Sequence, residues 1–150
     1  MYKIGDAVEM TKVFTEEDVH LFAGITGDRN PVHISKEYAA KTRFRERIVH
    51  GILTAGLISA AIGTKLPGPG SLYLSQTIDF LKPVKIGDEI TARVEIVEVI
   101  SEKRLRLRTQ CFNQRKEIVI DGEAVVVPPR PEGIRKGNQK REEGQGEQSQ

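Results

Sequence analysis

The sequence lacks the features that mark several common classes of protein. It has no tryptophan and a single cysteine, Cys111, which excludes an intramolecular disulfide. No apolar run is long enough to cross a bilayer, and the first residues lack the apolar core of a secretory signal. A net charge of +2 is too small to indicate nucleic-acid binding. We therefore expect a cytoplasmic protein that binds neither membranes nor nucleic acids.

A chain of 150 residues is sufficient for one domain with an ordinary hydrophobic core. Aromatic residues make up only 5% of the chain, so that core must consist mainly of aliphatic side chains. After Pro128 and Pro129 the composition changes to glycine, glutamine and charged residues, with Ile134 as the only aliphatic residue. Such a segment cannot bury enough apolar surface to offset the entropy of ordering. We predict a domain over residues 1–129 and a disordered polar tail over residues 130–150.

Two short helices are predicted in the first part of the chain. Thr15 is a suitable N-cap, and the three acidic residues after it favour the positive end of a helix dipole. Apolar spacings of three and four extend this helix to about residues 24–26. Ser35 can cap a second helix over residues 36–40.

The segment Gly51–Thr64 predicts a longer helix of a different kind. It carries no charge and is apolar on every side, which is typical of a buried helix. Small residues recur at every fourth position and form a stripe that would let a strand or a slender ligand approach closely. The stripe comprises Gly51, Ala55, Ser59 and Gly63.

From Ser71 onward the apolar period changes from helical to two, which predicts strands. A last strand is expected over residues 118–127, with a break at Asp121 and Gly122. The predicted order is helices first and an antiparallel sheet afterwards. This order corresponds to the α+β class, with the apolar helix lying across the sheet.

The densest group of chemically able side chains lies in residues 27–33. Pro31 forces Asn30 away from helical angles, so Asp28 and His33 are expected on a turned loop. An aspartate and a histidine there can transfer protons, and Asn30 can orient one of them or a water molecule. From composition alone, the same residues also suit an ordinary turn.

Metal binding and thiol chemistry are not favoured by the sequence. Asp28 and Asn30 imitate the start of an EF-hand loop, but the later ligand positions do not match. The three histidines and Cys111 are not at the short spacings of a zinc site, and Cys111 falls on the apolar face of a predicted strand. We expect neither a metal nor a cofactor.

Gly51 stands at the start of the apolar helix, where unpaired amides carry about half a positive charge. Because glycine has no side chain to block access to its N–H, this position suits an oxyanion hole. The alternative is that Gly51 only permits close packing.

A family resemblance rests on one run of residues, Phe22-Ala23-Gly24-Ile25-Thr26-Gly27-Asp28-Arg29-Asn30-Pro31-Val32-His33, followed by Ala39. This run resembles the signature of the MaoC-like hydratases, that is, (R)-specific enoyl-CoA hydratases and their 3-hydroxyacyl-thioester dehydratase relatives. The likeness continues through residues 42–44, 48–51, 67–73 and 80–88, and it covers about residues 13–127.

The resemblance implies a hot-dog fold, in which an antiparallel sheet wraps around one long central helix, and a homodimer with active sites near the interface. It implies reversible hydration of a trans-2-enoyl thioester to the (R)-3-hydroxyacyl product. Asp28 and His33 would be the catalytic acid/base pair, and the Gly51 amide would hold the enolate-like oxygen. Asn30 would hold the loop or the water. Ser59 is a weaker candidate for substrate contact, because helix packing also explains a small residue there.

Three alternatives differ from this hypothesis in carrier or class. The carrier could be acyl carrier protein instead of coenzyme A, which would make the chain a (3R)-hydroxyacyl-acyl-carrier-protein dehydratase. A hot-dog thioesterase would need a carboxylate near the central helix, and no acidic residue lies between Glu46 and Asp79. A non-catalytic acyl-thioester-binding or regulatory protein would have little need for the intact set of Asp28, Asn30 and His33.

Overall fold

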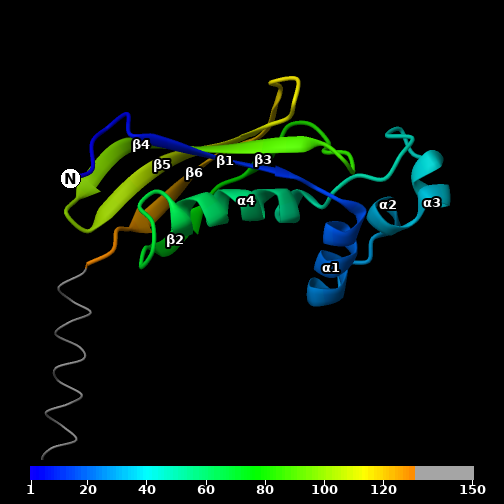
Figure 1. Cartoon of the computed structure of the whole chain (residues 1–150), viewed down its shortest axis with the longest axis horizontal. Coiled ribbons are helices and arrows are strands. Elements are labelled where there is room, and N and C mark those ends of the chain that lie inside the picture. Colours follow the sequence, from blue (N-terminus) through cyan, green and yellow to red (C-terminus); the bar gives the residue numbers. More distant parts are fainter. Residues whose placement is uncertain (131–150) are drawn as a thin grey trace, which may run out of the picture.

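The computed structural model describes residues 1–130, in which one antiparallel sheet lies across a single long helix (Figure 1). The order of neighbouring strands in the sheet is β1-β4-β5-β6-β2, and β3 pairs with β6. This arrangement confirms the predicted α+β class and the antiparallel sheet with a central helix. The strands are β1 (Ala7–Val13), β2 (Leu72–Gln76), β3 (Asp79–Phe80), β4 (Glu89–Ser101), β5 (Arg104–Phe112) and β6 (Ile118–Val127).

The core lies between the sheet and the long helix α4 (Gly51–Thr64). Alternate residues of β4 and β5 point toward α4, as the period of two predicts, and all are buried. The buried residues are Ile90, Ala92, Val94 and Ile96 on β4, and Leu105, Leu107, Thr109 and Cys111 on β5. Each fully buried valine, leucine or isoleucine side chain contributes about 1.5–3 kcal/mol.

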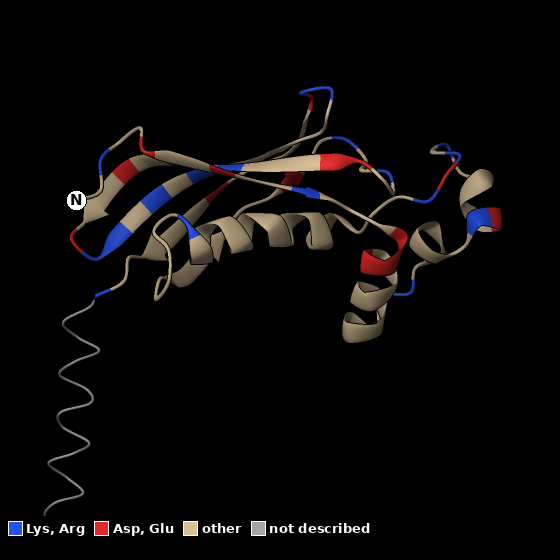
Figure 2. Ribbon diagram, in the orientation of Figure 1, with Lys and Arg blue, Asp and Glu red and all other residues tan. Residues whose placement is uncertain are grey.

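The opposite face of the sheet is charged. Basic bands run along β5 in Figure 2, where Arg106 pairs with Glu98 at 2.9 Å and Arg108 lies 3.8 Å from Asp121. These arginines alternate with the buried residues of β5 and therefore lie on the solvent side, away from α4.

Helix α4 has the predicted bounds, but the single chain buries only one of its faces. Thr54, Ile58 and Ala61 are fully buried against the sheet. On the other face, Ile52 is 60% exposed and Ser59 is also exposed. The prediction of a helix buried on every side is therefore wrong for one chain alone, because the sheet covers only one side of it.

Three short helices gather at the end of the sheet where α4 begins: α1 (Glu16–Thr26), α2 (Pro31–Ile34) and α3 (Lys36–Ala40) (Figure 1). The predicted caps are confirmed. Thr15 and Asp18 form a reciprocal capping box at the start of α1. The Ser35 hydroxyl accepts a hydrogen bond from the Tyr38 amide at 3.1 Å and caps α3.

Two expectations about the strands are wrong. The chain begins with a strand instead of a helix, since β1 pairs with β4 at the edge of the sheet. Strand β6 is continuous through Asp121 and Gly122. Gly122 is required there for a different reason, because a Cβ atom on it would lie 1.9 Å from the Thr77 carbonyl oxygen. The close approach of the segment between β2 and β3 thus explains this glycine.

No helix in residues 1–130 combines the length and the apolar character that a membrane crossing requires. The predicted disordered tail, apart from Arg130, lies outside the described residues, and the domain boundary at residue 129 stays a prediction.

Candidate active site

The loop between α1 and α2 presents Asp28 at the surface. Gly27 ends α1 in the left-handed conformation, with φ of 80°. The Asp28 carboxylate accepts a hydrogen bond from the Asn30 amide at 3.3 Å. The side-chain oxygen of Asn30 in turn accepts from the Val32 amide at 3.3 Å and caps α2. Asn30 therefore orders the loop that carries Asp28.

His33 lies in α2, a single helical turn, and not on the turned loop that the sequence indicated. Pro31 occupies the first position of that turn, where a backbone N–H would have no intrahelical partner, so its absence costs nothing. Asn30 still has the non-helical angles that were predicted for it, with φ of −51° and ψ of 122°. The prediction was wrong because Pro31 restricts the residue before it and is itself well suited to begin a helix.

The imidazole of His33 is buried and held in one tautomer. Its Nδ1 lies 2.7 Å from the Ile48 carbonyl oxygen, which can only accept, so Nδ1 carries the proton and Nε2 is the free basic nitrogen. Burial lowers the pKa of His33 below its ordinary value of 6.5, and His50 lowers that pKa further. The Ile48 hydrogen bond and the Asp28 carboxylate oppose this shift without cancelling it. His33 is therefore a neutral base at neutral pH.

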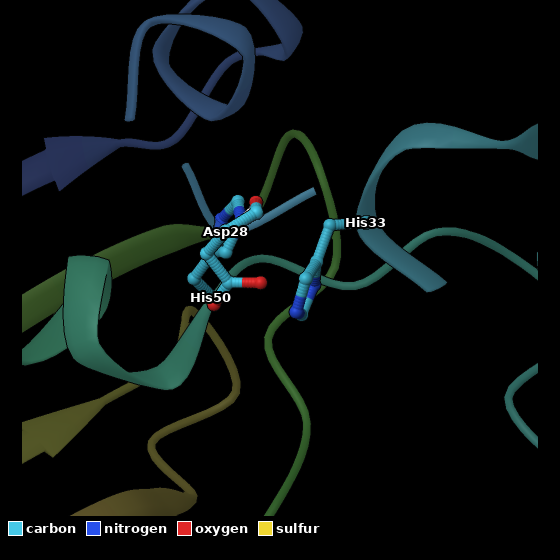
Figure 3. Close-up of side chains that lie close together, drawn as sticks. All are labelled: Asp28, His33 and His50. Atoms are coloured by element: carbon cyan, nitrogen blue, oxygen red, sulfur yellow. Dashed lines mark hydrogen bonds between the residues drawn. The ribbon is translucent and has the colours of Figure 1, made fainter. Parts of the chain in front are cut away.

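The fold brings Asp28 and His33 together, and it adds His50 to them (Figure 3). One polar atom from each of the three side chains lies within 4.8 Å of those of the others. The rings of His33 and His50 are stacked, with centroids 3.9 Å apart and planes at 30°. The two residues that the sequence selected as a pair are thus within reach of one water molecule.

The same three residues could in principle hold a metal ion, which the sequence spacing gave no reason to expect. One nitrogen of each histidine already faces a main-chain carbonyl oxygen, of Ile48 and of Asp28. Each ring thus keeps one nitrogen that could accept a proton or bind a metal ion, and the absence of a metal expected from the sequence stays a prediction.

A cavity of about 400 Å³ opens beside this group, and His33 and Gly51 both line it. Most of its other lining residues are apolar, including Phe80 and Ile120. Arg43 and Lys82 also line it. A largely apolar cavity with a few polar groups at one place is the usual form of a small-molecule site.

Gly51 is the first residue of α4, where the sequence suited either an oxyanion hole or close packing. A Cβ atom on Gly51 would lie 2.5 Å from the Phe80 ring, so this ring packs directly against the glycine. The preceding residue, His50, makes no side-chain capping bond, which leaves the first amides of α4 without a cap. These amides carry the positive end of the helix dipole beside the cavity.

Ser59 stands apart from the other sequence-predicted residues. It lies on the exposed face of α4, two turns beyond Gly51, and is not among the residues that line the cavity. Within residues 1–130 of one chain, nothing places it beside Asp28 and His33. A substrate contact by Ser59 stays a prediction.

His50 is the site residue that sequence reasoning missed. Its signal was its position, because helix N-caps are usually serine, threonine, aspartate or asparagine. A histidine directly before the first residue of a buried helix indicates some other role.

The chain is similar to known proteins of one family. The family model described as MaoC like domain matches residues 3–119. The chain is 50% identical over 131 residues to 3-hydroxybutyryl-CoA dehydratase of Methylorubrum extorquens, covering 87% of this chain and 83% of that protein. It is 45% identical to the (R)-specific enoyl-CoA hydratase of Rhodospirillum rubrum, and the match covers 85% of this chain and 88% of that protein. An unliganded R-hydratase structure from Pseudomonas aeruginosa superposes with a TM-score of 0.83 at 48% identity, covering 86% and 83%.

Proposed function

This chain belongs to the MaoC-like domain family, and from that premise we propose that it catalyses the reversible hydration of trans-2-enoyl-CoA to (R)-3-hydroxyacyl-CoA. One observation carries the proposal beyond family membership. Asp28 and His33 lie within reach of each other, and His33 shares an apolar cavity with the uncapped amide of Gly51. This set provides an anion-binding donor in the cavity that His33 lines, with Asp28 next to His33 outside that lining.

Water adds across the double bond in two linked changes. The water oxygen attacks C3 of the enoyl group as the pair Asp28 and His33 takes a proton from it. The π electrons move to the thioester oxygen, which becomes an enolate. The pair then returns a proton to C2, so that it ends as it began. Such acid–base help is worth roughly 10²–10⁴-fold in rate.

The enolate oxygen needs a donor that is already in place. The amide of Gly51 meets this need, because it stands at the start of a 14-residue helix that has no side-chain cap, and glycine has no side chain of its own to cover its N–H. A preorganised donor of this kind is worth about 3 kcal/mol to the transition state.

The carrier of the acyl group is anionic in either candidate substrate. Arg43 and Lys82 place positive charge among the cavity lining, which suits the phosphates of coenzyme A and equally the phosphopantetheine of acyl carrier protein. Arg104, Arg106 and Arg108 lie on the other face of the sheet and have no part in this recognition. Coenzyme A is the preferred carrier here, and acyl carrier protein is the alternative.

We further propose that the active form is a homodimer. Strand β2 ends the order of strands, and its residues Leu72 and Leu74 are 61% and 48% exposed. An apolar edge strand of this kind invites pairing with another chain. Ile52 on the uncovered face of α4 and the exposed Asp28 also favour a partner that completes the site.

We propose that the reaction needs no cofactor or metal, because the pair and the amide account for each proton and charge. Enzyme treated with a chelator should therefore retain full activity. The cytoplasmic location stays a prediction of the sequence. A non-catalytic thioester-binding protein remains the alternative from another class, and activity separates the two.

Incubation of purified protein with crotonyl-CoA tests the proposal. Absorbance of the enoyl thioester should fall without added metal or nucleotide, and the product should be (R)-3-hydroxybutyryl-CoA. Formation of the (S) product, release of a free thiol or absence of turnover would contradict it. The same assay with crotonyl-acyl-carrier-protein compares the two carriers.

A further inference from the structure

His50 joins parts of the site that are distant in the sequence. Its Nε2 lies 3.0 Å from the main-chain carbonyl oxygen of Asp28, and its ring stacks on that of His33. It directly precedes Gly51, whose amide begins α4. The ring is 2% exposed, and Phe22 packs on it with a centroid distance of 4.7 Å. One buried side chain thus contacts the segments that present the carboxylate, the base and the oxyanion donor.

The hydrogen bond to Asp28 determines the tautomer of His50. A carbonyl oxygen can only accept, so Nε2 of His50 must carry the proton. In the neutral ring Nδ1 is then an acceptor, and it has no partner among the described residues although it is buried. His33 has the opposite tautomer, with its proton on Nδ1.

A purely structural role accounts poorly for this arrangement. A buried acceptor without a partner costs about 1–3 kcal/mol, which an apolar ring of similar shape would avoid. His50 also fails to cap α4, a role that a serine or an aspartate at this position would fill. Neither a phenylalanine nor a serine at this position could place a hydrogen-bond donor where Nε2 of His50 lies.

We propose that His50 is a positioning residue for the hydration reaction, which acts mainly by fixing the main chain of Asp28 through its Nε2–H, whereas its stacking on the His33 ring contributes less. It acts on the two catalytic side chains and does not itself exchange a proton with substrate. This inference rests on the proposed function, since it assigns a part in that reaction.

Nitrogen NMR of the wild-type protein tests the geometry without any substitution. Long-range nitrogen–proton correlations distinguish the two neutral tautomers of each histidine. His50 should be protonated at Nε2 and His33 at Nδ1 near neutral pH. Protonation of His50 at Nδ1 would overturn the proposal, because the bond to Asp28 could not then exist.

Two substitutions separate the hydrogen bond from the stack. His50→Phe keeps a ring against His33 and loses the donor, whereas His50→Gln places an amide N–H near the position of Nε2 and loses the ring. We expect His50→Phe to lower kcat on crotonyl-CoA at least about tenfold, the size of one lost hydrogen bond. Its KM should change by less than about threefold, because substrate binding is not what His50 provides. His50→Gln should recover most of the lost kcat.

Equal losses of kcat in both variants, or wild-type kcat in His50→Phe, would overturn the assignment to the Nε2 donor. Melting temperatures of the two variants show whether a loss of kcat follows a loss of fold, and a loss that tracks the melting temperature in both would also contradict the proposal. A wild-type protein without hydratase activity would instead defeat the proposed function, and the tautomer result would stand independently of it.

Discussion

Asp28 and His33 act on the same water molecule in the proposed reaction, so their removal should not be additive. Asp28→Asn and His33→Ala should each lower turnover by at least about a hundredfold, within the range for lost acid–base help. The double variant should lose much less than the product of the two effects, because neither residue works without the other. Initial rates with crotonyl-CoA measure all three. A folded single variant with near-normal turnover would return these residues to a turn-forming role.

The protonation of His33 sets the acidic limit of activity. Burial, and then His50, lower its pKa below 6.5, so the ring stays neutral until the pH falls below that value. Turnover should therefore decline only below pH 6.5. In Asp28→Asn the His33 pKa should fall further, because the carboxylate that raises it is gone. NMR titration of the His33 ring checks both directions, and a pKa above 6.5 in the wild-type protein would contradict them.

The same shift links pH to stability. The unfolded chain binds a proton at this histidine near pH 6.5, and the folded chain binds it only at lower pH. Between the two values the unfolded state carries more protons, so the free energy of unfolding should fall as the pH drops below 6.5. The loss should level off below the folded pKa. Urea unfolding at intervals between pH 7 and 5 would show this contribution, which His33→Ala should lack.

At the scale of the element, the start of α4 combines an exposed amide with a tight contact. Gly51→Ala keeps the amide but places a methyl group where the Phe80 ring now lies. Phe80 is 54% exposed and can turn away, so we expect the melting temperature to change little. Its ring lines the cavity, however, and turnover should fall at least about tenfold if a donor at this position is displaced. The matched control is Gly24→Ala on α1, where a Cβ likewise meets no neighbouring atom.

Sequence reasoning was reliable for elements whose pattern is strong over many residues. The uncharged run of α4 and the alternation on β4 and β5 need only local chemistry to be recognised. Strand β1 was missed because an edge strand buries little. Only Val8 and Met10 turn toward the core, and the other residues of the strand are exposed.

The sequence predicted only those site residues that lie in one short segment of the chain. Asp28, Asn30 and His33 are close in sequence, so their motif indicates a common role. His50 reaches the same place from the start of α4, through a bond to a carbonyl oxygen 22 residues earlier. Any residue type has a main-chain carbonyl oxygen, so the sequence cannot indicate such a contact, and only the fold shows it.

At the scale of the whole molecule, the edge strand β2 predicts the mode of assembly. We expect a homodimer at micromolar concentration in sedimentation experiments. Leu72→Glu combined with Leu74→Glu should shift the equilibrium toward monomer and lower activity, since charge on an edge strand opposes pairing. Val99→Glu is the control, because Val99 is 44% exposed on β4, away from β2. A wild-type monomer with full activity would count against the dimer.

Cys111 can report the opening of the sheet in the native protein. It lies on β5 between Ala92 of β4 and Ile120 of β6, fully buried, and burial raises the pKa of its thiol to about 12. A thiol reagent can therefore react only after the centre of the sheet has opened. Because no other cysteine competes, the labelling rate under native conditions, where the sheet closes faster than the reagent reacts, reports the free energy of that opening. The stabilisation of the sheet by substrate or by a partner chain can thus be measured in unmodified protein.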